Sequence, residues 1–154
     1  MQLKYLFSTV LALLSLTSFS QESQEITYTN VQVYPVLSGC EDSKPINLRE
    51  CFELGVAQHV AETFTYTEAA RKENIKGTII VSFIVDKEGN ITDPKITQGI
   101  AGNYTGNESQ VQQAMVLEKN ALASIKGLKI TSPAIQAGKP VRFKYSFPLE
   151  TSLQ

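Results

Sequence analysis

The apolar positions of the chain change period along its length, and each period predicts a different element. In the first patterned segment apolar residues recur every four positions, at Leu48, Phe52, Val56, Val60 and Phe64. This spacing predicts an amphipathic helix, and Asn47, three residues before Glu50, favours a capped start near Leu48. A further helical turn or two is expected at Glu68 to Asn74.

The next pattern has a period of two. Apolar side chains alternate at Ile79, Val81, Phe83 and Val85. The turn-forming residues Asp86 to Asn90 follow, and Ile91 and Ile96 resume the pattern, so the segment predicts a β-hairpin. Pro94 has no N–H to donate, which predicts a bulge or an edge position in the second strand.

The last third of the chain predicts a loop, a helix and a strand. The stretch from Gly99 to Ser109 is rich in Gly, Asn and Thr, which favours a mobile loop. A second helix is marked by apolar residues at Ala114, Leu117, Ala121, Leu122 and Ile125, and Gly127 closes it. Strict alternation from Val141 to Phe147 predicts a half-buried strand that ends at Pro148.

The order helix, hairpin, helix, strand predicts an α+β domain. Three strands are too few to close a barrel, and two amphipathic helices each need an apolar surface to cover. We therefore expect two helices packed on one face of a three-stranded antiparallel sheet, with the other face partly exposed to water.

The first twenty residues are typical of a signal peptide. Lys4 precedes an apolar run from Tyr5 to Leu16, and small residues stand at Ser18 and Ser20. We expect export and cleavage after Ser20. An uncleaved membrane anchor is the alternative, but a spanning helix needs about 20 apolar residues and polar residues interrupt this shorter run. The polar stretch from Gln21 to Asn30 has no period and is expected to be a frayed arm without function.

Cys40 and Cys51 are the two cysteines of the chain. Because an exported protein folds in an oxidising compartment, we expect them to pair as one local disulfide. Closing a loop of this size stabilises a fold by about 3 kcal/mol in the chain-entropy account. Two buried free thiols are the alternative. A redox role is not expected, because the chain lacks the closer C-x-x-C spacing of a redox pair.

Composition removes several classes of function. The 154 residues carry 14 basic and 15 acidic side chains, so no basic stripe indicates a nucleic-acid partner. One histidine and two cysteines are too few for a closed zinc site, and we expect no metal or cofactor. His59 has no partner for catalysis that spacing can assign, and Asp86 and Glu88 are typical turn residues. We therefore do not expect an enzyme.

Two long stretches resemble the carboxy-terminal domain of TonB, the periplasmic energy transducer. The first is FTYTEAARKENIKGTIIVSFIVDKEGNITDPKI, from Phe64 to Ile96, and the second is LEKNALASIKGLKITSPAIQAGKPVRFKYSFPL, which ends at Leu149. Upstream, YPVLSGCEDSKPINLRECF is similar to a cysteine-bearing extension of TonB-like domains in one bacterial lineage. We accordingly expect a signal peptide at 1–20, a polar arm and turn-rich lead-in at 21–46, a TonB C-terminal-like domain at 47–150 and a tail at 151–154.

The resemblance implies binding rather than catalysis. Domains of this family capture the TonB-box segment of TonB-dependent outer-membrane receptors as a strand added beside their last strand, and inner-membrane proton-driven motor proteins supply the work. The implied partner-binding edge strand comprises Val141, Arg142, Phe143, Lys144, Tyr145, Ser146 and Phe147. Its alternating pattern agrees with an edge open to β-augmentation. Arg142 and Lys144 are expected on the wet face, where they either steer an acidic receptor segment or protect the edge from aggregation.

A second function stays open. A complete transducer carries a membrane helix followed by a Pro-rich spacer, and the sequence has neither pattern. The alternative is an exported partner-binding or self-associating module, such as a homodimer, that works without energy transduction, because an open strand edge can also pair with a second copy.

We predict that the protein isolated from its native cells begins at Gln21 and fractionates with the soluble periplasm. Intact mass and amino-terminal sequencing of each cell fraction measure this. A chain that retains Met1 to Ser20 and sediments with the inner membrane would contradict cleavage and indicate the anchored alternative, which faces the periplasm.

Overall fold

The order of elements along the chain is seen in a computed structural model that describes residues 26–151. The predicted signal peptide at 1–20 lies outside the described residues. The elements are β1 (Thr27–Tyr28), β2 (Val36–Leu37), the 3-10 helix η1 (Pro45–Asn47), α1 (Leu48–Thr63), α2 (Glu68–Lys72), β3 (Gly77–Val85), β4 (Ile91–Gln98), the 3-10 helix η2 (Ala101–Tyr104), α3 (Glu108–Ser124), β5 (Ile130–Ser132), β6 (Ala134–Gln136) and β7 (Lys139–Thr151).

The mixed α+β class is confirmed, but the predicted count of elements is wrong. The main sheet has five strands rather than three, in the order β1-β7-β3-β4 with β6 also paired to β7. A separate two-stranded sheet joins β2 to β5, and the described residues contain three α-helices. The sheet is also not wholly antiparallel, because β1 runs parallel to β7. Strands of two or three residues are too short to produce a period, which is why the sequence pattern missed them.

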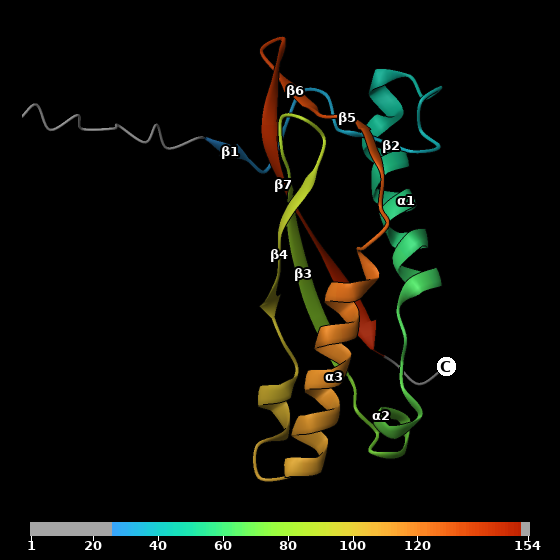
Figure 1. The fold of residues 1–154 in the computed structure, drawn as a ribbon, viewed down its shortest axis with the longest axis vertical. Coiled ribbons are helices and arrows are strands. Elements are labelled where there is room, and N and C mark those ends of the chain that lie inside the picture. The colour runs from blue at the N-terminus through green and yellow to red at the C-terminus, as the bar shows by residue number, and fades with distance from the viewer. Residues whose placement is uncertain (1–25, 152–154) are drawn as a thin grey trace, which may run out of the picture.

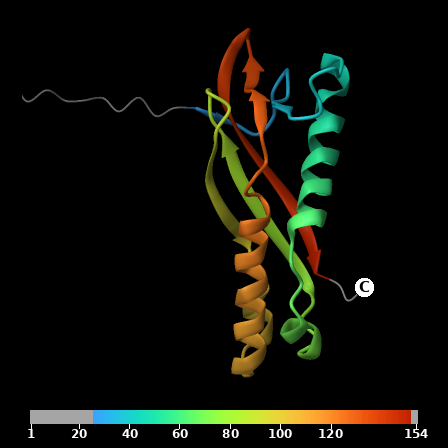
Figure 2. The same ribbon diagram turned by 45° about the vertical axis from the view of Figure 1, so that its right-hand side comes forward.

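The long antiparallel pair of β3 and β7 forms the centre of the fold. Its register runs without a shift from Gly77 opposite Thr151 to Val85 opposite Phe143. Helices α1 and α3 lie on the same side of this pair, as Figures 1 and 2 show. The β3 residues that face this side are fully buried: Ile79, Val81, Phe83 and Val85.

Four of the five residues in the predicted stripe form the buried face of α1, while the fifth, Phe64, is half-buried and follows the helix as its C-cap. Leu48, Phe52, Val56 and Val60 are its buried residues. The helix begins at Leu48 as predicted, but the side chain of Asn47 makes no capping hydrogen bond. Instead, the 3-10 turn of η1 continues directly into α1. This turn starts the helix in place of a capping box.

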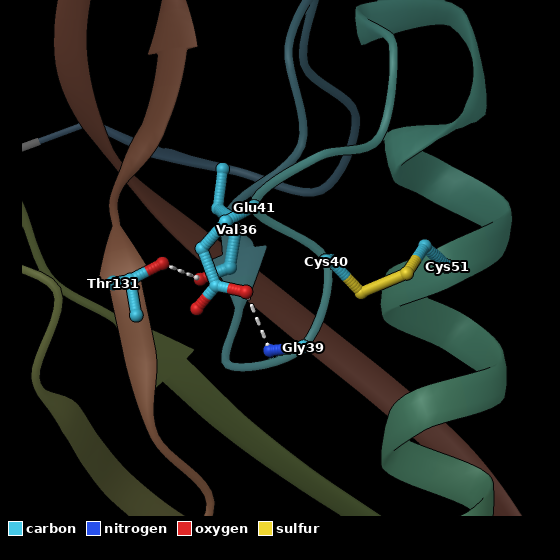
Figure 3. The surroundings of a disulfide bond; sticks show 6 residues. All are labelled: Val36, Gly39, Cys40, Glu41, Cys51 and Thr131. Atoms are coloured by element: carbon cyan, nitrogen blue, oxygen red, sulfur yellow. Dashed lines mark hydrogen bonds between the residues drawn. A yellow bond between two sulfur atoms is a disulfide. The ribbon is translucent and has the colours of Figure 1, made fainter.

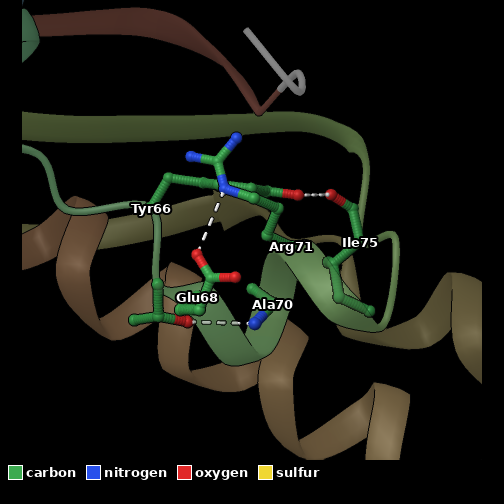
Figure 4. Close-up of polar contacts among 6 residues, drawn as sticks. Tyr66, Glu68, Ala70, Arg71 and Ile75 are labelled. Carbon is green, nitrogen blue, oxygen red and sulfur yellow. Dashed lines mark hydrogen bonds and ion pairs between the residues drawn. The ribbon is translucent and has the colours of Figure 1, made fainter.

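The short helix α2 turns the chain from α1 into β3. Thr67 Oγ1 accepts a hydrogen bond from Ala70 N at 3.1 Å and caps the first turn. Tyr66 donates its hydroxyl to the carbonyl of Ile75, and the Arg71 guanidinium lies 5.3 Å above the Tyr66 ring (Figure 4). These contacts tie both ends of the turn together.

The stretch from Gly99 to Ser109 is more ordered than the loop predicted from its composition. It contains η2 and the first residues of α3. Glu118 Oε1 accepts hydrogen bonds from the backbone N–H groups of Ile100 and Ala101, at 2.6 and 2.9 Å. Asn107 caps α3 by accepting from Gln110 N at 3.2 Å. Small polar residues here make caps and turns rather than a mobile loop.

The predicted disulfide joins Cys40 to Cys51, whose Cα atoms lie 6.0 Å apart. Figure 3 shows it linking the segment after β2 to α1. Ser38 N donates to Lys129 O at 2.8 Å, and Thr131 Oγ1 donates to Val36 O at 3.3 Å. The lead-in is thus held between α1 and β5.

We predict that replacing both cysteines by alanine, C40A/C51A, lowers the free energy of unfolding by about 3 kcal/mol, because the unfolded chain regains the entropy of an open loop. Alanine is preferred to serine since Cys40 is buried. Urea unfolding monitored by circular dichroism gives the value. Wild-type protein reduced with a thiol is the matched control and should lose the same amount; a loss below about 0.5 kcal/mol in both would refute the stabilising role.

Candidate strand-addition site

The strand β7 is held in place by its own aromatic side chains. Phe143 packs on Tyr34 with ring centroids 5.0 Å apart, and Tyr145 packs on Phe52 of α1 at the same distance. The ring of Phe147 packs on the ring of Phe83 in β3, with centroids 6.5 Å apart. All three contacts are edge-to-face, a favourable geometry for aromatic pairs. The alternate residues of β7 therefore anchor the strand and leave its backbone in a fixed position.

Pro148 reveals which backbone groups of β7 are not used by β3. It lies opposite Ile80 within the unbroken antiparallel register. Because proline has no N–H, this pair cannot be a hydrogen-bonded one, and the two kinds of pair alternate along an antiparallel ladder. The N–H and C=O groups of Ser146 and Glu150 therefore point away from β3. We call this side of the strand the outer edge of β7.

The prediction that the last strand ends at Pro148 is wrong. The strand continues to Thr151, which lies opposite Gly77. The missing N–H falls on the outer edge, where no hydrogen bond to β3 is lost, so the proline does not interrupt the ladder. Its position instead makes the last part of the outer edge a poor partner for another strand.

The outer edge is partly occupied. Residues Thr27 and Tyr28 of β1 lie opposite Arg142 and Phe143 in the parallel direction. Beyond Phe143, no strand among residues 26–151 pairs with this side of β7. The arm predicted to be frayed therefore includes a short strand, and this strand sits on the segment predicted to bind a partner. No periodic signal in the sequence indicated it.

The opposite edge of the sheet, at β4, is protected. Its register with β3 shifts twice, and Asp93 has a left-handed backbone with φ of 49°. Pro94 follows, and Lys95 forms an ion pair with Asp93 at 2.9 Å. Bulges, a proline and charges are devices that prevent edge-to-edge pairing. The bulge or edge predicted at Pro94 is confirmed on both counts, and β4 is unsuited to strand addition.

Arg142 and Lys144 lie on the face of β7 opposite the aromatic side chains, and both are half-buried. Lys144 stands across from Ile84, and Ser146 stands across from the buried Ser82. These two side chains are thus partly exposed to water, as predicted for this face of the sheet. The two cations lie beside the outer edge and add positive charge to it.

Tyr145 is the one titratable side chain of the edge strand with a strongly displaced pKa. Burial against Phe52 and Phe83, together with the nearby negative charge of Glu53, raises the pKa of Tyr145 to about 12. Arg49 acts in the opposite direction without cancelling this shift. The phenol therefore remains neutral at physiological pH and contributes through the packing of its ring.

The other residues considered for chemistry have structural partners. A ring nitrogen of His59 lies 3.0 Å from Lys126 O, which connects α1 to the end of α3. Although burial acts to raise it, hydrogen bonds from Asn90 and Glu88 hold the pKa of Asp86 below its ordinary value. Within the part of the chain described by the structure, no group of three His, Cys, Asp or Glu side chains is placed to bind a metal.

An α+β domain whose accessible feature is an anchored strand edge has the character of a protein-interaction domain. Residues 62–104 match the model of the family described as Gram-negative bacterial TonB protein C-terminal. The match covers less than half of the chain, from the end of α1 through η2, and confirms the resemblance over that segment. Neither a curated protein nor a solved structure matches the chain.

The matched family consists of non-enzymatic interaction domains that contact outer-membrane receptors in energy-coupled transport across the envelope. The matched residues include β3, and β3 is the strand that positions β7. None of the helices between residues 26 and 151 has the length and apolarity that a membrane crossing requires.

We predict that the variant Tyr145→Phe lacks the latest phenol ionisation of the native protein, the one with a pKa of about 12. Tyrosines in an unfolded chain have a pKa of about 10. As the pH rises, the unfolded state therefore loses the Tyr145 proton before the native state does. The stability contributed by the neutral Tyr145 is complete below about pH 10 and declines as the pH rises toward 12. Ultraviolet titration of the two proteins tests this; a variant that instead loses an ionisation near the ordinary tyrosine value would refute it.

Proposed function

We propose that this protein is a periplasmic, TonB-like binding protein that captures outer-membrane receptor segments by β-strand addition at the outer edge of β7, within energy-coupled transport. The observation that carries the proposal is the outer edge itself. It extends beyond Phe143 without a partner strand among the described residues, and the pairing of β1 with Arg142 and Phe143 supports its use for strand addition.

The rigidity of β7 supports this function. Binding of a strand to an edge that is already ordered costs less conformational entropy than binding to an edge that becomes ordered on binding. The aromatic contacts of Phe143, Tyr145 and Phe147 fix the backbone before binding. The predicted binding segment, Val141 to Phe147, precedes Pro148 in the chain. It therefore coincides with the part of the outer edge that Pro148 does not block.

Charge gives the proposed partner a chemical character. Arg142 and Lys144 lie together on one face beside the outer edge, and the side chain of Glu150 is engaged by a 2.7 Å hydrogen bond from Thr78. An extended segment with an acidic residue would be attracted to this face, and the association rate would fall with added salt.

The proposed location follows from the disulfide and the amino-terminal segment. Cys40 and Cys51 are paired, which suits an oxidising compartment. Cleavage after Ser20 would release the domain into the periplasm, where its partners would be TonB-dependent receptors. If the segment 1–20 is retained, the inner-membrane anchor would place the domain beside proton-driven motor proteins. Self-association of β7 edges in a homodimer without energy transduction remains the alternative proposal.

We predict that Ser146→Pro weakens binding of a synthetic TonB-box peptide about tenfold or more. The variant removes an N–H that points away from β3 and places a ring on the outer edge, while the hydrogen bonds to β3 remain. Nuclear magnetic resonance titration of the labelled full chain measures affinity and locates the amides that the peptide perturbs. Ser146→Ala, which retains the N–H, is the matched control.

Two results would count against the proposal. One is peptide perturbation confined to β4 or to the helices. The other is equal affinity in S146P and S146A. A protein that binds no peptide and forms a dimer sensitive to S146P in analytical ultracentrifugation would support the self-associating alternative in its place.

A further inference from the structure

We propose that the arm formed by residues Ile26 to Asn30 is a built-in occupant of the outer edge of β7, and that a receptor segment binds by displacing it. This inference rests on the proposed function of the edge and adds a competition to it. The arm would act as a weak cover over this strand, and a bound partner would take its place.

The base of the arm is firmly attached to β6. Val33 and Ile135 exchange two backbone hydrogen bonds, of 3.1 and 3.0 Å. The side-chain amide oxygen of Gln136 accepts from Gln32 N at 2.9 Å, and that of Gln32 accepts from Ala137 N at 2.8 Å. Next in the chain, Tyr34 enters the core between Phe52 and Phe143. The arm therefore has a fixed origin only a few residues from its paired tip.

The tip of the arm is held far more weakly than its base. Only Thr27 and Tyr28 pair with β7, and both side chains are half-buried. Ile26 is 69% exposed, and Thr29 and Asn30 are exposed at the bend that follows. A two-residue strand has little stability alone. It pairs here because a short tether to a fixed base gives the tip a high effective concentration at the edge.

The arm and the proposed partner need the same backbone groups. Arg142, like Pro148, occupies a position of β7 whose backbone groups do not bond to β3. Its N–H and C=O therefore point to the outer edge, and β1 lies opposite this residue. A partner strand along Val141 to Phe147 would require them as well. It cannot avoid the arm by moving toward the end of β7, because Pro148 interrupts that part of the edge. One edge accepts one strand, so the two are mutually exclusive.

This arrangement has a quantitative consequence for binding. The apparent dissociation constant of the partner is its intrinsic value divided by the fraction of molecules whose edge is open. A weak cover lowers the affinity by a modest factor and shields the backbone of Arg142 from pairing with a second copy. Destabilising the tip while keeping the base should therefore increase affinity.

The double variant Thr27→Pro/Tyr28→Pro in the full chain tests the inference. Two prolines prevent β1 from pairing, while the hydrogen bonds at Gln32 and Val33 remain. The control T27V/Y28F keeps every backbone N–H and a high strand propensity. Two readouts apply: hydrogen exchange of the Arg142 and Lys144 amides without any partner, and the affinity of the synthetic TonB-box peptide.

We expect the proline variant to exchange its Arg142 and Lys144 amides at least about tenfold faster and to bind the peptide about three- to tenfold more tightly. The control should match the wild type in both. A peptide with the sequence of residues 26–31, ITYTNV, added in excess to the proline variant, should restore protection at Arg142. This last readout needs no receptor sequence.

The outcomes separate this inference from the proposed function. Unchanged exchange in the proline variant, or no protection by ITYTNV, would overturn the arm as an occupant. Faster exchange with unchanged or weaker TonB-box binding at β7 would overturn the competition and leave receptor binding intact. If the TonB-box peptide perturbs β7 in none of the proteins, receptor binding fails and the proposed displacement fails with it, while exchange and ITYTNV still report whether the arm covers the edge.

Discussion

The antiparallel pairing of β3 with β7 is the interaction on which the rest of this structure depends. It joins Gly77–Val85 to Phe143–Thr151, segments that are far apart in the chain, so its formation must overcome a large loop-closure entropy. Cross-strand and helix-to-strand contacts of Phe83, Tyr145 and Phe52 offset part of that cost. Helices α1 and α3 then cover the same side of the pair, and both edges of the sheet are defined by it.

The two edges differ in a way that suits one-sided recognition. At β4, shifted register, Pro94 and the Lys95–Asp93 ion pair discourage any added strand. At β7, Pro148 protects only the end of the strand, and the residues before Pro148 are held in place by the aromatic contacts of Phe143, Tyr145 and Phe147. The fold therefore protects one edge and leaves part of the other without a partner strand among the described residues.

The disulfide and the aromatic core connect this edge to the amino-terminal segment. Cys40 is bonded to α1, and Tyr34 packs between α1 and β7, so the start of the arm is fixed close to β7. The proximity of the arm to the binding strand therefore follows from core packing and not from any property of the arm's own sequence. The short strand β1 can pair with β7 because the base of the arm, at Gln32 and Val33, is fixed to β6.

Local sequence patterns were sufficient to predict the elements that are long enough to show a period. The stripe of α1, the β3–β4 hairpin, the apolar positions of α3 and the alternation of β7 are all local patterns, because each reflects which side chains one element must bury. Helix α3 itself ends at Ser124, before the Gly127 predicted to close it. The other features depend on contacts between segments that are distant in the chain. Strands β1, β2, β5 and β6 exist because neighbouring strands supply hydrogen-bond partners, which two or three residues cannot indicate alone. Whether Pro148 ends β7 or only blocks its outer edge depends on which side β3 occupies, and that is a property of pairing between distant segments.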